Sequence, residues 1–190
     1  MKRVLSLAYP IDDTVEINGE KYELDMSFDN VIRLIDMLND DELDDITKIE
    51  IGLYMLLSVE LDYDIEKKAK IFKEIFEKVI LEGEKAEPAL DIQGNPMPEK
   101  KEKVIYSLKE DAEYIYASFM QDYGIDLIEE QGKLHWYKFK ALLSGLRNDT
   151  HFKEILNIRT MELPKGKGME KERRRIMELK EVYKLKDQSD

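Results

Sequence analysis

The spacing of large apolar residues in the last third of the chain constrains the fold most strongly. Two stripes recur at intervals of three and four residues, which places the members of each stripe on one side of an α-helix. The first stripe consists of Trp136, Phe139 and Leu143, and the second of Phe152, Ile155, Leu156 and Arg159. A polar break at residues 147–150 separates them. We therefore expect two amphipathic helices whose stripes pack together, with Trp136, Phe139, Leu143 and Phe152 as core anchors.

The segment after the second stripe has no apolar period. Pro164 disfavours helical geometry before it, and the glycines of Lys165-Gly166-Lys167-Gly168 add backbone freedom, so the helix must stop here. A phosphate-binding loop is disfavoured, because the preceding strand, the glycine spacing and a following Ser or Thr are missing. We expect the stretch from Arg159 to Arg175 to be an accessible recognition segment for a protein partner. Its proposed contact residues are Arg159, Met161, Leu163, Lys165 and Lys167.

The N-terminal region predicts a β-hairpin. Alternation in residues 14–17 and 20–24 surrounds Asn18-Gly19, a pair that tolerates the positive φ angles of a type I′ turn. Because an exposed hairpin edge can pair with a neighbour, Asn18, Gly19 and Tyr22 are candidate contacts between copies. Ser27 is the predicted cap of the helix that follows.

Helical spacing continues through most of the remaining chain. Further helices are predicted at about 28–38, 46–58, 65–82, 107–123 and 169–186, with Asp64 as a cap and with Ser107 and Glu110 as a capping box. The fold class is mainly α with a small N-terminal β-hairpin, arranged as two bundle-like helical units. The predicted units are residues 1–83 and 104–190, and residues 84–103 form a Pro-rich, charged linker or exposed loop.

Composition narrows the classes of function. The absence of cysteine excludes thiol catalysis, disulfides and thiolate-bound metals. The net charge of −12 is divided unevenly: residues 1–83 carry −11 (10 basic against 21 acidic), residues 84–150 carry −4 (9 against 13), and residues 151–190 carry +3 (11 against 8). Nucleic acid is therefore disfavoured as the main partner, and the basic last 40 residues can meet either an acidic partner or the acidic N-terminal half of the chain itself. No membrane span or signal peptide is expected, which favours the cytoplasm.

Catalytic and metal-binding patterns are weak. His135 and His151 are the only histidines, and neither has a carboxylate in a ligand spacing. The acidic turn at residues 40–45 lacks the glycine and the closing glutamate of a calcium loop. Arg173–Arg175 can contact phosphates, although surface ion pairs are the favoured reading. No catalytic residue, metal site or cofactor site is predicted.

Two stretches resemble known phage proteins. The words DAEYIYASFMQDYGIDLIEEQGKLHW, WYKFKALLSGL, FKEILNIRTMELPKGKG and MEKERRR resemble the bacteriophage gene-product-fifteen family of siphophages and prophages. The stretch EINGEKYELDMSFDNVIRLIDML is similar to the start of tail assembly chaperones, which open with a hairpin followed at once by a helix.

This resemblance implies a product of the tail morphogenesis region. Tail assembly chaperones coat the tape measure protein and deliver tail tube subunits to it. The implied function is therefore a non-enzymatic tail assembly chaperone in the cytoplasm of the bacterial host, with the tape measure and tail tube proteins as partners and homo-oligomerisation as a further possibility. The alternatives are a structural tail or head–tail joining component retained in the virion, then a small regulatory or host-interaction protein, and last an enzyme.

Overall fold

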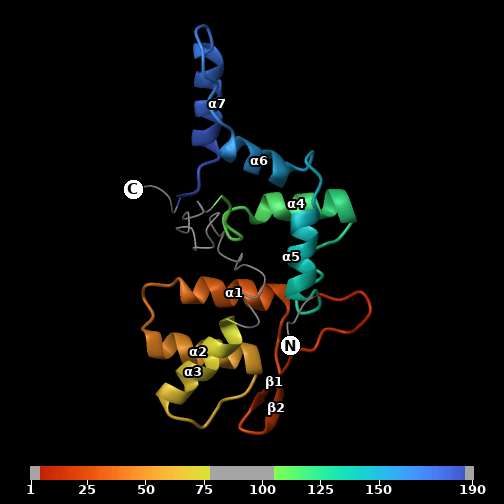
Figure 1. The fold of residues 1–190 in the computed structure, drawn as a ribbon, viewed down its shortest axis with the longest axis vertical. Helices are drawn as coiled ribbons and strands as arrows, with labels where there is room; N and C mark the ends of the chain where they lie inside the picture. Colours follow the sequence, from red (N-terminus) through yellow and green to blue (C-terminus); the bar gives the residue numbers. More distant parts are fainter. Residues whose placement is uncertain (1–4, 78–104, 187–190) are drawn as a thin grey trace, which may run out of the picture. The chain divides into compact units, whose positions relative to one another are not determined.

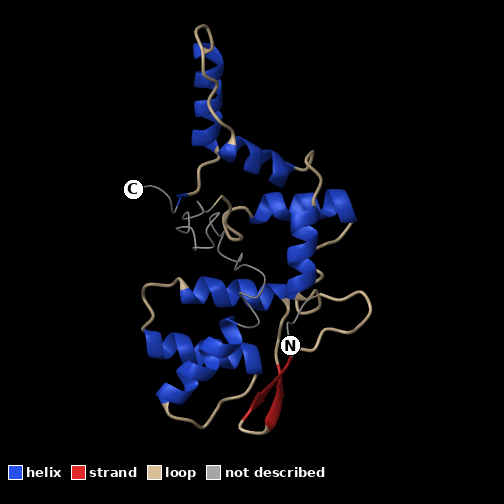
Figure 2. Ribbon diagram, viewed as in Figure 1, coloured by secondary structure: helices blue, strands red, loops and turns tan. Residues whose placement is uncertain are grey.

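The chain folds mainly into helices. A computed structural model describes residues 5–77 and 105–186, and within these residues the sheet content is one two-stranded antiparallel hairpin (Figures 1 and 2). In chain order the elements are β1 (Thr14–Ile17), β2 (Glu20–Glu23), α1 (Phe28–Leu38), α2 (Asp45–Leu57), α3 (Ile65–Ile75), α4 (Ala112–Tyr123), α5 (Trp136–Gly145), α6 (His151–Thr160) and α7 (Glu170–Val182). The predicted class, mainly α with a small N-terminal hairpin, is confirmed.

The described residues form two compact units. The first contains the described residues of Met1–Lys100 together with Gln131–Lys140, and the second contains those of Lys101–Glu130 and Ala141–Asp190. Helix α5 therefore begins in the first unit and ends in the second. The sequence placed all of residues 104–190 in one C-terminal unit, so the assignment of Gln131–Lys140 differs from that prediction. The predicted linker at 84–103 lies outside the described residues, as does the end of the helix predicted at 65–82.

The hairpin follows directly from its turn residues. Asn18 and Gly19 have φ values of 53° and 86°, which is the left-handed pair that a type I′ turn requires. The strands pair with Ile17 opposite Glu20 and Val15 opposite Tyr22. One face of the hairpin is anchored in the core through Ile17.

Helices α1, α2 and α3 form the body of the first unit. Asp44 and Asp64 cap α2 and α3, because each carboxylate accepts the amide three residues later, at 2.8 and 2.9 Å. Ser27 occupies the N-cap position of α1, as predicted, but its hydroxyl donates to Asp25 at 2.6 Å and makes no capping hydrogen bond to the helix. Where α1, α2 and α3 meet, Gly52 leaves no room for a side chain, since a β-carbon there would lie 2.6 Å from the ring of Phe72.

The segment at residues 131–140 is hydrogen-bonded to the start of α1. Backbone amides of Phe28 and Trp136 donate to the carbonyls of Leu134 and Met26, at 2.9 and 2.8 Å. The amide of Gly132 donates to the Asp29 carboxylate at 2.8 Å. These bonds join residues about one hundred positions apart in the sequence, which explains why this segment belongs to the first unit.

The ring contacts of this segment correct the predicted packing. Phe139 stacks on Phe28 with ring centroids 4.9 Å apart, and Trp136 stacks on Phe139 at 5.7 Å. Phe152, the expected partner of these rings, instead meets the edge of Tyr106 at 5.7 Å. Helical periodicity identified the buried sides of both helices but carried no information about the partner of each.

The second unit is built around α4 and α6. The hydroxyl of Ser118 on α4 accepts the amide of Phe152 at 3.0 Å. Helix α4 thus supplies the capping hydrogen bond that the side chain of Thr150, the N-cap residue of α6, does not make. Helix α4 ends at Gly124 in the left-handed conformation, as its sequence predicts. Its start differs from prediction, since the helix begins only at Ala112.

Candidate partner-binding site

Residues 161–182, here called the arm, form the most solvent-exposed part of the second unit. The arm consists of a segment without helix or strand, residues 161–169, and helix α7 (Figure 1). Ile176 is the buried residue of α7, whereas Met177 and Val182 are 56% and 73% exposed. A helix with so little apolar contact gains little stability from packing within its own unit and would gain more from a partner that covers it.

The conformation of residues 161–169 follows from their sequence. Met161 leaves helical geometry with φ −54° and ψ 130°, three residues before Pro164. Gly166 and Gly168 then adopt positive φ values of 143° and 87°, which turn the chain into α7. Of the predicted contact residues, Met161, Lys165 and Lys167 are exposed and Leu163 is partly buried. Three of the five predicted contact side chains are therefore accessible.

Arg159 occupies a different position from the predicted one. Its guanidinium lies inside the second unit, 11% exposed, and grips the Asp111 carboxylate with both terminal nitrogens at 2.7 Å. Its remaining nitrogen donates to the carbonyl of Tyr183 at 2.6 Å, and Lys180 donates to the Arg159 carbonyl at 3.0 Å. Arg159 is thus the anchor at the base of the arm and does not form part of its accessible surface.

Asp111 is the residue that sequence reasoning missed. It is fully buried, and its carboxylate accepts a hydrogen bond from the backbone amide of Ser107 at 3.0 Å. The predicted capping box assigned this hydrogen bond to the side chain of Glu110. A signal was present in the sequence, since Arg159 extends the apolar stripe of α6. A charge on a buried helix side requires an opposite charge to compensate its lost hydration. The pattern could not show which carboxylate would supply it.

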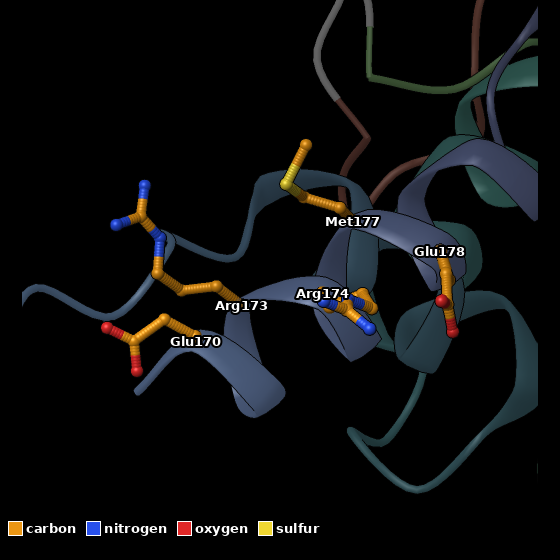
Figure 3. Close-up of a pocket in the computed structure, with 5 residues that line it drawn as sticks. All are labelled: Glu170, Arg173, Arg174, Met177 and Glu178. Carbon is orange, nitrogen blue, oxygen red and sulfur yellow. The ribbon is translucent and has the colours of Figure 1, made fainter. Parts of the chain in front are cut away.

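The outer side of α7 carries an open, shallow hollow. It is lined by Glu170, Arg173, Arg174, Met177 and Glu178, all drawn in Figure 3. Arg173 and Arg174 are exposed and form no ion pair with any described residue, contrary to the surface pairing that the sequence favoured. Two free guanidinium groups around a methionine suit a protein surface with carboxylates and an apolar patch.

The predicted hairpin contacts lie at the turn and on β2. Asn18 and Gly19 are exposed, and the Asn18 amide donates to the Tyr63 hydroxyl at 2.9 Å. The Tyr22 hydroxyl donates to Glu20 at 2.7 Å, and this bond is the first cause of a raised pKa at Tyr22. These bonds fasten the hairpin within its own unit, and contact between copies through its edge stays a prediction.

The two histidines serve internal contacts. His135 accepts the Tyr137 amide at Nδ1, 3.0 Å away, so its proton sits on Nε2, which donates to Asp13 at 3.1 Å. His151 packs edge-on against Tyr114 with ring centroids 4.8 Å apart. Across residues 5–77 and 105–186, no group of three or more acidic or histidine side chains is placed to hold a metal ion.

The four predicted core anchors are divided between the two units. Trp136 and Phe139 are buried in the first unit, whereas Leu143 and Phe152 are buried in the second. The indole nitrogen of Trp136 is buried without a hydrogen-bond partner among the described residues. The sequence identified residues that are buried, but the unit to which each belongs required the structure.

Comparison with known proteins places the chain in one family. A family model described as Bacteriophage Gp15 protein matches residues 10–185, and the chain therefore belongs to this family. Membership makes it a bacteriophage structural or assembly protein. No curated protein and no solved structure matches the chain. In the part of the chain that the structure describes, none of the helices combines the length and the apolar character needed to cross a membrane.

Proposed function

We propose that this member of the bacteriophage Gp15 family is a tail assembly chaperone, which binds the tape measure protein and recruits tail tube subunits during tail morphogenesis. It acts by binding alone, without a catalytic step or a cofactor, in the cytoplasm of the bacterial host. The resemblance of residues 16–38 to the start of tail assembly chaperones supports the assignment to tail morphogenesis.

The arm is the observation on which this proposal rests. An assembly chaperone needs a surface that is uncovered in the free protein and covered in the complex. Residues 161–169 meet this need, because Met161 and Met169 are exposed apolar groups beside the cations of Lys165 and Lys167. Such a segment suits an apolar or acidic patch on a partner, and its affinity is limited by the ordering that binding requires. Moderate affinity also suits a chaperone that must later leave.

The experiment is capture of the two partners by the purified full-length chain. The variant Met161→Ala/Lys165→Ala/Lys167→Ala removes accessible groups only, so we expect unchanged folding and weaker capture of the tail tube or tape measure protein. The matched control is Met120→Ala/Lys138→Ala/Lys70→Ala, which changes the same residue types at other exposed positions. If the triple arm variant captures both proteins as wild type does, recognition lies elsewhere.

A second measurement separates a chaperone from a virion component. Mass spectrometry of purified particles should find the tail tube and tape measure proteins but not this chain. Recovery of the chain in stoichiometric amounts from mature tails would replace the proposal by the structural alternative, a tail or head–tail joining component.

A further inference from the structure

Helix α2 in the first unit has an uncovered apolar side. Ile46, Ile51 and Tyr54 are 55%, 37% and 55% exposed, and their positions along the helix place them on one side of it. We call these three residues the α2 stripe. Single exposed apolar residues are ordinary, but a row of two isoleucines and a tyrosine is characteristic of a surface that a partner covers.

The surroundings of the α2 stripe are strongly acidic. Between residues 40 and 60 the chain has seven acidic residues and one basic residue. The acidic residues are Asp40, Asp41, Glu42, Asp44, Asp45, Glu50 and Glu60, and all are exposed. Glu50 forms an ion pair with Lys68 at 2.9 Å. The remaining carboxylates create a negative rim that selects a basic partner.

Helix α7 offers the complementary surface. Arg173, Arg174 and Met177, here called the α7 face, combine two cations that have no ion pair among the described residues with one apolar side chain that is 56% exposed. Figure 3 shows Arg173 and Met177 extending outward from the helix. Glu170 and Glu178 line the same hollow as the α7 face, but the arm as a whole has seven basic and five acidic residues. The arm is therefore basic where the surroundings of the α2 stripe are acidic, and both surfaces present exposed apolar side chains. They also match in length, since each helix has 13 residues and spans about 20 Å.

We propose that the α7 face of one copy docks on the α2 stripe of a second copy. Met177 lies against Ile46, Ile51 and Tyr54, and Arg173 and Arg174 lie among the carboxylates around them. The contact is head-to-tail, because each copy contributes a different surface. Such contacts extend into a row of copies when the geometry does not close a ring.

The strength of this contact follows from its size. Two short helices bury less than the roughly 1,200 Å² of a standard stable interface, so the association is weak and depends on concentration. The proposal goes beyond the chaperone function, because it concerns the protein alone and holds whatever the arm segment at residues 161–169 binds. A protein that captures no tail partner can still self-associate, and the reverse also holds.

Sedimentation velocity of the full-length protein tests the proposal. Across about 1 to 200 µM, wild type should change from monomers to dimers and longer species, as expected for a weak interface. The α7-face variant Arg173→Glu/Arg174→Glu and the α2-stripe variant Ile46→Lys/Tyr54→Lys should each weaken association about tenfold or more, because like charges then meet. All four positions are exposed, so folding should be retained.

The matched control reverses two other cations of the same helix. At 100° per residue, Lys171 and Arg175 lie more than a quarter-turn from the centre of the α7 face, and both are exposed. The variant Lys171→Glu/Arg175→Glu makes the same change of net charge, yet it should associate as wild type does. Equal weakening in this control would mean that net charge alone governs association, and would overturn the proposal.

Mixing the two defective proteins gives the sharpest outcome. The α7-face variant retains its α2 stripe and the α2-stripe variant retains its α7 face, so an equimolar mixture should form 1:1 dimers and nothing longer. Failure of the mixture to form dimers would overturn the head-to-tail contact. A wild-type protein that stays monomeric at every concentration would also overturn the proposal. If, in addition, both variants change the sedimentation coefficient of the monomer by the same amount, the α7 face docks on the α2 stripe within one chain.

Discussion

Arg159 and Asp111 form a two-pronged ion pair inside the second unit, with both nitrogen–oxygen distances at 2.7 Å. The carboxylate is 1% exposed and the guanidinium 11% exposed. Water therefore cannot take the place of either partner unless the surrounding side chains rearrange. Because Arg159 also bonds to the carbonyl of Tyr183, the pair links the ends of α6 and α7 to the start of α4.

Loss of one member of this pair should destabilise the second unit strongly. We expect Arg159→Ala to lower the free energy of unfolding by about 3–5 kcal/mol, because a buried charge loses its partner. Hydrogen exchange should show the amides of α7 losing protection first. The control is Arg33→Ala, which breaks an exposed pair with Asp29 and should cost no more than about 0.5 kcal/mol. Similar effects for the two variants would show that the buried pair has no special role.

The aromatic stack of the first unit should contribute to its stability from a distant part of the sequence. Phe139→Ala removes a ring that is 1% exposed and stacks on Phe28, so we expect a loss of about 3–5 kcal/mol in urea unfolding. Lys138→Ala changes the neighbouring exposed residue of the same helix and should have little effect. If the cost of Phe139→Ala is below about 1 kcal/mol, the ring has no well-packed environment.

The hairpin register predicts different effects for two proline substitutions. In a two-residue hairpin the pairs Ile17–Glu20 and Val15–Tyr22 exchange hydrogen bonds, so the amide of Tyr22 points inward and that of Lys21 points outward. Tyr22→Pro should therefore destabilise the hairpin, whereas Lys21→Pro should retain it. Chemical shifts of Asn18 and Gly19 report which outcome occurs. If copies also pair through the β2 edge, Lys21→Pro should reduce self-association without loss of the fold.

Acid should destabilise the second unit through Asp122. Its pKa is held below the ordinary value, first by the backbone amide of Arg147 at 2.8 Å and then by the Arg147 side chain. A carboxyl whose folded pKa is depressed contributes stability at pH values above its unfolded pKa of about 3.9, and this contribution is lost as the pH falls through the folded pKa. Stability should thus change little through Asp122 between about pH 7 and pH 5 and fall below about pH 4.

The variant Asp122→Asn isolates this effect. It should be less stable than wild type at neutral pH and approach wild type as the pH falls, since the neutral amide cannot lose a charge. Urea unfolding at several pH values measures the difference. Parallel curves for the two proteins would assign the acid sensitivity to other carboxylates, such as Asp44, whose pKa the Thr47 amide also lowers.

Local sequence signals predicted local structure well. The hairpin is determined by Asn18 and Gly19, and the caps at Asp64 and Gly124 follow from single residues. Ser27 takes the predicted N-cap position of α1, but its hydroxyl makes no capping bond because it donates to a carboxylate two residues earlier, a competition that one-residue propensities do not include.

Helical periodicity could not predict which residues distant in the sequence contact each other. The accessibility of Met161, Lys165 and Lys167 could be predicted from the absence of an apolar period around them. The position of Arg159 could not, because its partner Asp111 lies 48 residues away. The same limitation applies to Phe139, whose periodicity predicts burial without identifying Phe28 as the ring that it meets.

The return of residues 131–140 to the first unit has a consequence during synthesis. The ribosome completes helices α1, α2 and α3 by residue 77, but the ring that stacks on Phe28 is synthesised 62 residues later, at Phe139. At about 5–20 residues per second this interval is roughly 3–12 seconds. For that time the apolar surface at the start of α1 is uncovered in the nascent chain. The first unit therefore stays incompletely folded until residues 131–140 have been synthesised.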